Sequence, residues 1–202
     1  MACKFPIRGE NMSLYGQYVI PVVKNMSQYE LFLKSSYEYG VYLETNIAHL
    51  KPISLLAKEH NKKILFHTDL IMGLKNDEYS VEYICQEIKP YGIISTRPNV
   101  ISKAKKRGLM TVQRIFLLDS QALEKSYTIA KKTEADYLEI LPGIIPDYIK
   151  TIGQVTSIPV LTGGLISTKI EIANAINAGA KAVTTSNVSL WMSMEETRQV
   201  HA

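Results

Sequence analysis

Apolar residues in this chain gather in short runs that alternate with longer amphipathic segments. Eight runs rich in β-branched residues are predicted strands: Tyr18–Val23, Gly40–Glu44, Ile64–Leu70, Gly92–Thr96, Met110–Phe116, Tyr137–Leu141, Pro159–Thr162 and Ala182–Thr185. Most are continuously apolar, which is typical of parallel strands covered by helices, whereas strands with one solvated face alternate. The pattern therefore predicts parallel strands that are buried on both faces.

The segments between these runs carry the signals of helix starts. Ser27 with Glu30, and Thr168 with Glu171, have the spacing of a capping box, in which two side chains satisfy the first backbone N–H groups of a helix. Asn99 is expected to cap the helix that follows the fourth predicted strand. Each predicted strand is thus followed by a helix.

Strict alternation of strands and helices predicts one compact TIM-type (β/α)8 barrel with parallel strands. We expect residues 18–202 to form this single domain and residues 1–17 to form an N-terminal extension. Such barrels typically take about 250 residues, so an open doubly wound sheet is the structural alternative. Against it, the first predicted strand runs into Lys24 and Asn25 without a glycine-rich dinucleotide fingerprint.

Composition and charge exclude several classes of protein. The chain is 46% apolar and 21% charged, as in ordinary soluble domains, and its net charge of +4 is only a mild bias towards anionic ligands. Cys3 and Cys85 lie far apart and form no metal-spaced pair, which favours a reduced, cytoplasmic setting and no metal. No stretch approaches the roughly 20 apolar residues of a membrane span, so we expect no membrane partner.

A phosphate site is predicted after the last two strands. Gly163 and Gly164 follow the seventh, where adjacent glycines let backbone N–H groups approach an anion. Ser186 and Asn187 follow the eighth, can add side-chain donors, and can cap a helix whose N-terminus points at the same anion. Phosphate-binding barrels commonly use these two loops. A tight turn and an ordinary helix cap remain the alternative.

Polar residues at the ends of the middle strands are candidates for the rest of a ligand. Asp69 is a candidate general base or hydroxyl ligand, and the neighbouring His67 is expected to be structural. The other candidates are Ser95, Arg97, Gln113, Arg114 and Glu139. A polar residue within a strand is costly to bury unless it is paired or bound, so an internal Arg114–Glu139 pair remains an alternative to ligand binding.

Lysine clusters occur at three places. The helix after the fourth strand carries Lys103, Lys105, Lys106 and Arg107, and further pairs are Lys62–Lys63 and Lys131–Lys132. Such clusters usually form solvated helix faces, although together they could contact the phosphates of a nucleic acid. No RNA-recognition motif accompanies them.

Several long motifs of the chain resemble the glycerol-3-phosphate-responsive antiterminator family. They are HTDLIMGLKNDEY at 67–79, YGIISTR at 91–97, QRIFLLDS at 113–120, EILPGII at 139–145, TGGLI at 162–166 and TTSN at 184–187. The resemblance covers about residues 18–192. It implies a barrel that binds glycerol-3-phosphate and then the leader of glycerol-operon messenger RNA, which prevents premature transcription termination.

The resemblance also distributes roles. It implies that Gly163, Gly164, Ser186 and Asn187 hold the phosphate, and that Asp69, Gln113 and Glu139 are candidates for the glycerol end. We therefore expect a regulator without catalytic residues or a cofactor, with glycerol-3-phosphate and leader mRNA as partners and with a homo-oligomer left open. The rival hypothesis is an isomerase or lyase of a phosphorylated substrate, with Asp69 as base and Glu139 as acid.

Overall fold

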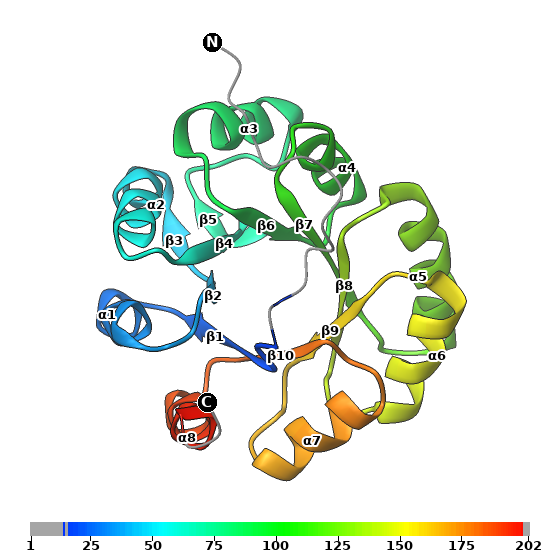
Figure 1. The fold of residues 1–202 in the computed structure, drawn as a ribbon. Helices are drawn as coiled ribbons and strands as arrows, with labels where there is room; N and C mark the ends of the chain where they lie inside the picture. Colours follow the sequence, from blue (N-terminus) through cyan, green and yellow to red (C-terminus); the bar gives the residue numbers. More distant parts are fainter. Residues whose placement is uncertain (1–13, 15, 200–202) are drawn as a thin grey trace.

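Eight parallel strands close into a barrel in the computed structural model, which describes residues 14 and 16–199. Around the barrel the strands follow the order β1-β10-β9-β8-β7-β6-β4-β2, so the expected TIM-type barrel is confirmed (Figure 1). Their bounds are Val19–Val23 (β1), Tyr39–Tyr42 (β2), Lys63–His67 (β4), Gly92–Ser95 (β6), Met110–Phe116 (β7), Tyr137–Leu141 (β8), Val160–Gly163 (β9) and Ala182–Thr185 (β10).

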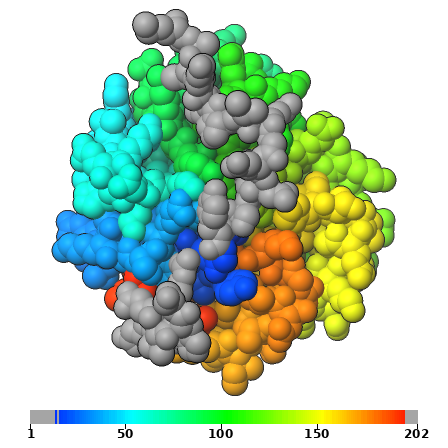
Figure 2. Space-filling model, in the orientation of Figure 1, coloured from blue at the N-terminus to red at the C-terminus, as the bar shows by residue number. Residues whose placement is uncertain are grey.

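Helices surround the barrel in sequence order, and Figure 2 shows the corresponding segments following one another around the molecule. They are α1 (Met26–Lys34), α2 (Leu50–Glu59), α3 (Glu78–Tyr83), α4 (Pro98–Lys106), α5 (Ser120–Thr133), α6 (Pro146–Thr156), α7 (Lys169–Asn177) and α8 (Val188–Gln199). The π-helical turn η3 (Ile84–Ile88) continues α3, and the 3-10 turns are η1 (Ile47–His49) and η2 (Thr68–Leu70). No helix within these residues is long and apolar enough to cross a membrane.

The third predicted strand was too long. β4 ends at His67 and η2 follows, because the chain turns there to let Asp69 reach the end of β6. The sequence pattern did not reveal two short strands, β3 (Thr45–Asn46), which precedes α2, and β5 (Ile71–Met72), which follows η2. These two strands pair with each other outside the barrel.

Two of the three predicted helix caps were wrong. Asn25 and not Ser27 caps α1, since its side chain accepts the backbone N–H of Gln28. Pro98 occupies the first turn of α4, which places Asn99 inside the helix. The capping box of Thr168 and Glu171 at α7 is confirmed. Proline at a helix start needs no N–H partner, which is why it takes precedence over a nearby cap residue.

Strand residues divide between two apolar clusters. One set points into the barrel and includes Ile20, Leu65, Val112 and Leu161, while the other packs between the strands and the helices. Because successive side chains of a strand point to opposite faces, membership of the inner cluster identifies which alternate residues face the barrel axis. This assignment decides which polar side chains line the mouth of the barrel, which is its opening at the carboxyl ends of the strands.

Two residues before β1 pack against the barrel. Leu14 belongs to the inner cluster, and Gln17 is only 1% exposed. The Gln17 amide nitrogen donates to the carbonyls of Val19 and Tyr39, and its oxygen accepts the N–H groups of Glu38 and Tyr39. Residue 17 thus ties the segment before β1 to β2. Residues 1–13 and 15 of the expected extension lie outside the described residues.

Replacement of Gln17 tests this packing. Gln17→Leu keeps the volume but leaves buried backbone groups of β1 and β2 without partners, so the free energy of unfolding should fall by about 2–4 kcal/mol. The exposed Gln86→Leu should change it by less than about 0.5 kcal/mol. Urea unfolding compares the two variants, and an unchanged midpoint for Gln17→Leu would place Gln17 outside the folded unit.

Candidate ligand-binding site

Polar side chains face the barrel axis at the carboxyl ends of four strands. His67 is two residues beyond the inward-facing Leu65, and Arg114 is two beyond Val112. Glu139 is in register with both Arg114 and the inward-facing Leu161, and Thr184 is in register with Ile20. The barrel interior therefore changes from apolar to polar towards the end where TIM-type barrels bind ligands.

The Glu139 carboxylate is fully buried in this mouth and is paired on both oxygens. It accepts from Arg114 Nε at 2.6 Å and from Thr184 Oγ1 at 2.6 Å. The Arg114 side chain is itself only 10% exposed. A buried charge needs such partners, because an unpaired one would cost several kcal/mol. The internal pair, left open by the sequence, is thus present, and it forms the polar floor of the mouth.

His67 was expected to be structural, yet its position on β4 places it in the same mouth. Its side chain is 3% exposed, and its Nδ1 has no hydrogen-bond partner among the described residues. Burial and then the nearby charge of Arg114 lower the pKa of His67 to about 4, so the imidazole is neutral at neutral pH. A neutral imidazole can both donate and accept, which suits the recognition of a ligand hydroxyl.

Asp69 links the ends of β4 and β6 at the rim of the mouth through hydrogen bonds. Its carboxylate accepts from Ser95 Oγ at 2.5 Å and from the backbone N and Oγ1 of Thr96, both at 2.7 Å. Burial acts to raise the pKa of Asp69, but these hydrogen bonds outweigh it and hold the pKa below its ordinary value. Ser95 also accepts from the N–H of Arg97. Asp69 and Ser95 therefore join the ends of β4 and β6, an arrangement that fits a supporting role better than the predicted ligand contact.

Gln113 faces away from the mouth. It is in register with Leu138 of the outer cluster, on the opposite face of β7 from Arg114. Its amide nitrogen donates to the carbonyls of Ser95, Thr96 and Arg114. We therefore remove Gln113 from the proposed ligand set. Arg97, in contrast, is exposed at the N-terminus of α4, on the rim of the mouth.

The two predicted phosphate loops lie side by side, because β9 and β10 are paired. A Cβ on Gly163 would meet Thr184 Oγ1 at 2.1 Å, so Gly163 is required for the approach of Thr184 to Glu139. Gly164 is exposed and has φ +73°, a conformation that glycine adopts without strain. Gly164 thus presents open backbone, whereas Gly163 supports the floor of the mouth.

The second loop leads directly into α8. The Asn187 side-chain oxygen accepts the N–H of Leu190 at 3.1 Å, so Asn187 caps this helix. Ser186 is exposed next to it. A capped helix of twelve residues directs the positive end of its dipole towards this loop. Together with Gly164, these features form a surface that suits an anion.

A family model described as glycerol-3-phosphate responsive antiterminator matches residues 19–191, the part of the chain that builds this barrel and its mouth. The chain belongs to this antiterminator family. The resemblance noted in the sequence motifs is thereby confirmed.

Solved structures and curated relatives agree with this assignment. A glycerol uptake operon antiterminator regulatory protein from Listeria monocytogenes is 42% identical, with a TM-score of 0.84 over 93% of this chain and 99% of that one. An antiterminator-related protein from Thermotoga maritima is 25% identical, with a TM-score of 0.77 over 87% and 98%. The uncharacterised Escherichia coli K12 protein YgcP is 29% identical over 86% of this chain and 91% of its own. These similarities indicate a regulator of glycerol uptake operon antitermination.

Enzymes share only the fold of this antiterminator family member. The aldolase QR15 is 16% identical, with a TM-score of 0.69 over 92% of this chain and 97% of that one. Among the described residues, no three His, Cys, Asp or Glu side chains cluster as a metal site requires.

Most of the predicted RNA-contacting cluster on α4 is already neutralised. Lys103 pairs with Glu78 and Glu82, and Arg107 also pairs with Glu82. Lys105 pairs with Asp136 on the neighbouring unit. Lys106 is exposed, and no ion pair is recorded for it among the described residues. The α4 cluster is therefore mainly a set of ion pairs to neighbouring elements, which is neither the expected RNA contact nor a fully solvated face.

Sequence reasoning missed Lys24. Lys24 directly follows β1, and β1 is paired with β10, so Lys24 lies on the rim beside the loop that carries Ser186. Its side chain is exposed and forms no ion pair with any residue that the structure describes. The only signal was its place at a strand end, which becomes informative once β1 and β10 are known to be neighbours.

The buried imidazole predicts a specific pH dependence. The unfolded chain, with a His pKa near 6.5, takes up a proton before the folded chain with its lowered pKa does. The free energy of unfolding should therefore fall as the pH drops from about 6.5 towards 4, and His67 should contribute nothing to its pH dependence well above pH 6.5. His67→Gln should reduce the loss between pH 7 and pH 5 by about 2 kcal/mol.

Denaturant unfolding at both pH values measures this difference. The control Gln86→Leu, at an exposed position, leaves every imidazole in place and should keep the wild-type profile. Identical profiles for His67→Gln and the wild type would show that His67 is not held neutral in the mouth.

Proposed function

We propose that the mouth binds glycerol-3-phosphate, and that the ligand-bound protein binds the leader of glycerol-operon mRNA to prevent premature termination. The main support for this proposal is that a surface suited to an anion and a polar floor lie together at one end of the barrel. The open backbone of Gly164 lies beside the capped N-terminus of α8, and the floor next to it holds Glu139, Arg114 and His67. A phosphate ester of a small polyol has one anionic end and one hydroxyl end, which match these two features.

The phosphate end would lie over the loops after β9 and β10. Backbone N–H groups near Gly164, the Ser186 hydroxyl and the N-terminus of α8 supply donors there. None of these groups carries a full positive charge, so we assign that role to Lys24 on the neighbouring rim. Charge-assisted hydrogen bonds to phosphate are roughly twice as strong as neutral ones.

The glycerol end would lie against the polar floor. The unpartnered Nδ1 of His67 can bond a hydroxyl, and the guanidinium of Arg114, which Glu139 holds in place, offers further donors. A site that hydrogen-bonds hydroxyls rejects analogues that lack them, because its buried polar groups are then left without partners. The proposal involves no metal or cofactor, and such a regulator would act in the cytoplasm, where transcripts are made.

Ligand binding should raise the thermal stability. A ligand that binds only the folded state at about 100 times its dissociation constant adds roughly 2.7 kcal/mol, or about 5–10 °C in melting temperature for this size. Glycerol-3-phosphate should produce this shift and glycerol should not. Lys24→Ala should weaken binding by about 10–100-fold, whereas Lys125→Ala, an exposed position on α5, should not.

Thermal scans and titration calorimetry measure these effects. Equal shifts from glycerol and glycerol-3-phosphate, or no shift with either compound, would overturn the assignment of the mouth. Wild-type affinity in Lys24→Ala would remove Lys24 from the phosphate end.

An isomerase or lyase is the second candidate, and one observation favours it. A neutral imidazole and a buried carboxylate lie in one mouth, as acid–base catalysis of a phosphorylated substrate would require. Against it, both carboxylate oxygens of Glu139 are occupied by Arg114 and Thr184, and Asp69 is bound to Ser95 and Thr96.

Prolonged incubation separates the two candidates. Glycerol-3-phosphate and dihydroxyacetone phosphate should remain unchanged, as followed by phosphorus NMR. Turnover near an ordinary enzymatic rate of about 1 per second that disappears in Glu139→Gln would establish the enzyme instead.

A further inference from the structure

The two ends of the barrel differ in charge. The mouth rim is formed by the connections from strands to helices and by the first helix turns, and it carries charges of both signs. Its carboxylates are Glu44, Asp77, Glu78, Asp119, Asp147 and Glu171, and its cations are Lys24, Lys51, Lys75, Arg97 and Lys169. The rim also exposes large apolar side chains, among them Leu118 at 84% and Leu165 at 72%. The charges of this rim nearly cancel, so it attracts a polyanion less than a surface on which exposed lysines outnumber carboxylates.

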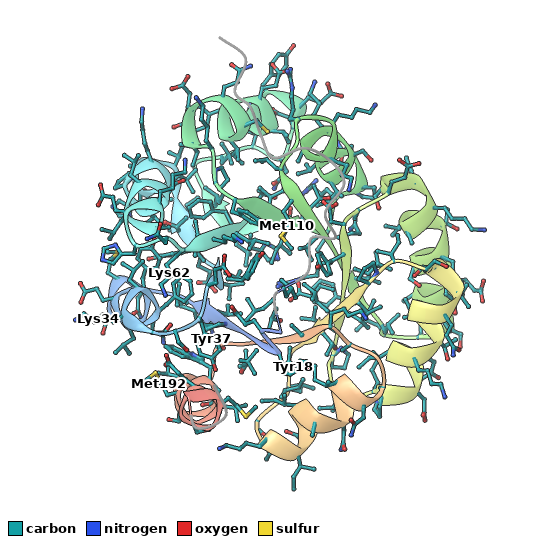
Figure 3. The ribbon with its side chains drawn as sticks, in the orientation of Figure 1. Tyr18, Lys34, Tyr37, Lys62, Met110 and Met192 are labelled. Carbon is teal, nitrogen blue, oxygen red and sulfur yellow. The ribbon has the colours of Figure 1, made fainter. Side chains whose placement is uncertain are left out.

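The opposite end collects exposed lysines. These residues lie in the last turns of the helices or in the connections that lead to the next strand: Lys34, Lys89, Lys106, Lys131, Lys132 and Lys181. Figure 3 marks Lys34 beside α1 and, nearer the barrel, Lys62. No ion pair is recorded for these six residues among the described side chains. Exposed glutamates on this end are fewer and include Glu59, Glu87 and Glu134.

Four of these lysines follow one another on consecutive units, and we call them the basal arc: Lys89 after η3, Lys106 at the end of α4, and Lys131 and Lys132 at the end of α5. α4 packs against both α3 and α5, so the three sites are neighbours on the surface. Adjacent packed helices lie about 8–10 Å apart. The basal arc thus runs over three neighbouring units, which also expose Glu87 and Glu134.

Helix dipoles favour lysines at this end of the barrel. A lysine near a helix C-terminus is stabilised by the negative end of the dipole. Lys106, Lys131 and Lys132 lie in last turns, and Lys89 is the left-handed C-cap of η3. Two other lysines on the same end have partners within the protein. Lys62 donates to the carbonyls of Ser35 and Tyr37, and Lys63 forms an ion pair with Glu38. The charge of the basal arc therefore remains available for a partner.

We propose that the basal arc, at the end of the barrel opposite the ligand mouth, is the surface that contacts the phosphates of the leader RNA. This proposal rests on the proposed antiterminator function, which supplies the polyanionic partner. It assigns ligand and RNA to opposite ends of one barrel, so glycerol-3-phosphate promotes RNA binding without touching the RNA.

Two charge-matched variants test the location. The arc variant replaces Lys89, Lys106, Lys131 and Lys132 with alanine, and the control variant replaces Lys51, Lys75, Lys125 and Lys150, which are exposed but lie outside the arc. Both variants lose the same charge, so a difference between them reports position and not net charge. Retention of the thermal shift with glycerol-3-phosphate shows that each variant is folded and binds its effector.

RNA affinity is measured with the leader of the glycerol uptake operon from the genome that encodes this chain, at 50–200 mM salt with saturating glycerol-3-phosphate. Each lost phosphate contact lowers the slope of log affinity against log salt by about 0.7–0.9. The arc variant should lose about 3 units of slope and at least about tenfold in affinity, and the control variant should lose less than about 1 unit.

The possible failures are distinct. If the wild-type protein binds the leader and the arc variant binds it equally well, or if the control variant is the one that loses affinity, the basal arc is not the RNA surface while the proposed function stands. If the wild-type protein retains no leader RNA with or without glycerol-3-phosphate, the proposed function fails and the surface assignment fails with it.

Discussion

The buried carboxylate of Glu139 constrains the half of the barrel that forms the mouth. Glu139 has no exposed surface, so its charge is tolerable only with Arg114 and Thr184 in hydrogen-bonding contact. Thr184 can approach only because residue 163 lacks a side chain, and Arg114 can approach only because β7 and β8 pair in a register that sets it opposite Glu139. Strand order, strand register and the glycine at the end of β9 thus all contribute to stabilising this one charge. Burial and the charge of Arg114 keep His67 neutral.

The fold was readable from the sequence because parallel strands buried on both faces leave long apolar runs. All eight barrel strands were located in this way, and the family motifs pointed to the correct family. The same property hides orientation, since a strand without alternation does not reveal which side chains point inwards. Gln113 was misplaced for this reason, since it faces the helices and not the mouth. His67, which was expected to be structural, is buried in the mouth, and its Nδ1 has no partner among the described residues.

Other features missed in the sequence depend on neighbours that only the closed barrel brings together. Lys105 meets Asp136 across 31 positions of sequence, which turned an expected RNA contact into an ion pair. Lys24 lies beside the loop that carries Ser186 only because β1 pairs with β10 and closes the barrel. The two-residue strands β3 and β5 are too short to carry a hydrophobic pattern. Local signals therefore predicted elements well and their partners poorly, as expected where pairing is set by tertiary contacts.

The central claim is that occupation of the mouth controls RNA binding at a separate surface. Two sites that share one protein are coupled if each ligand favours the same state, and couplings of about 5–150-fold are typical. The direct test is a titration of the glycerol-operon leader RNA with the full chain, in the presence and absence of glycerol-3-phosphate. The account predicts RNA binding at least about tenfold tighter with the ligand. Equal affinity under both conditions would contradict it.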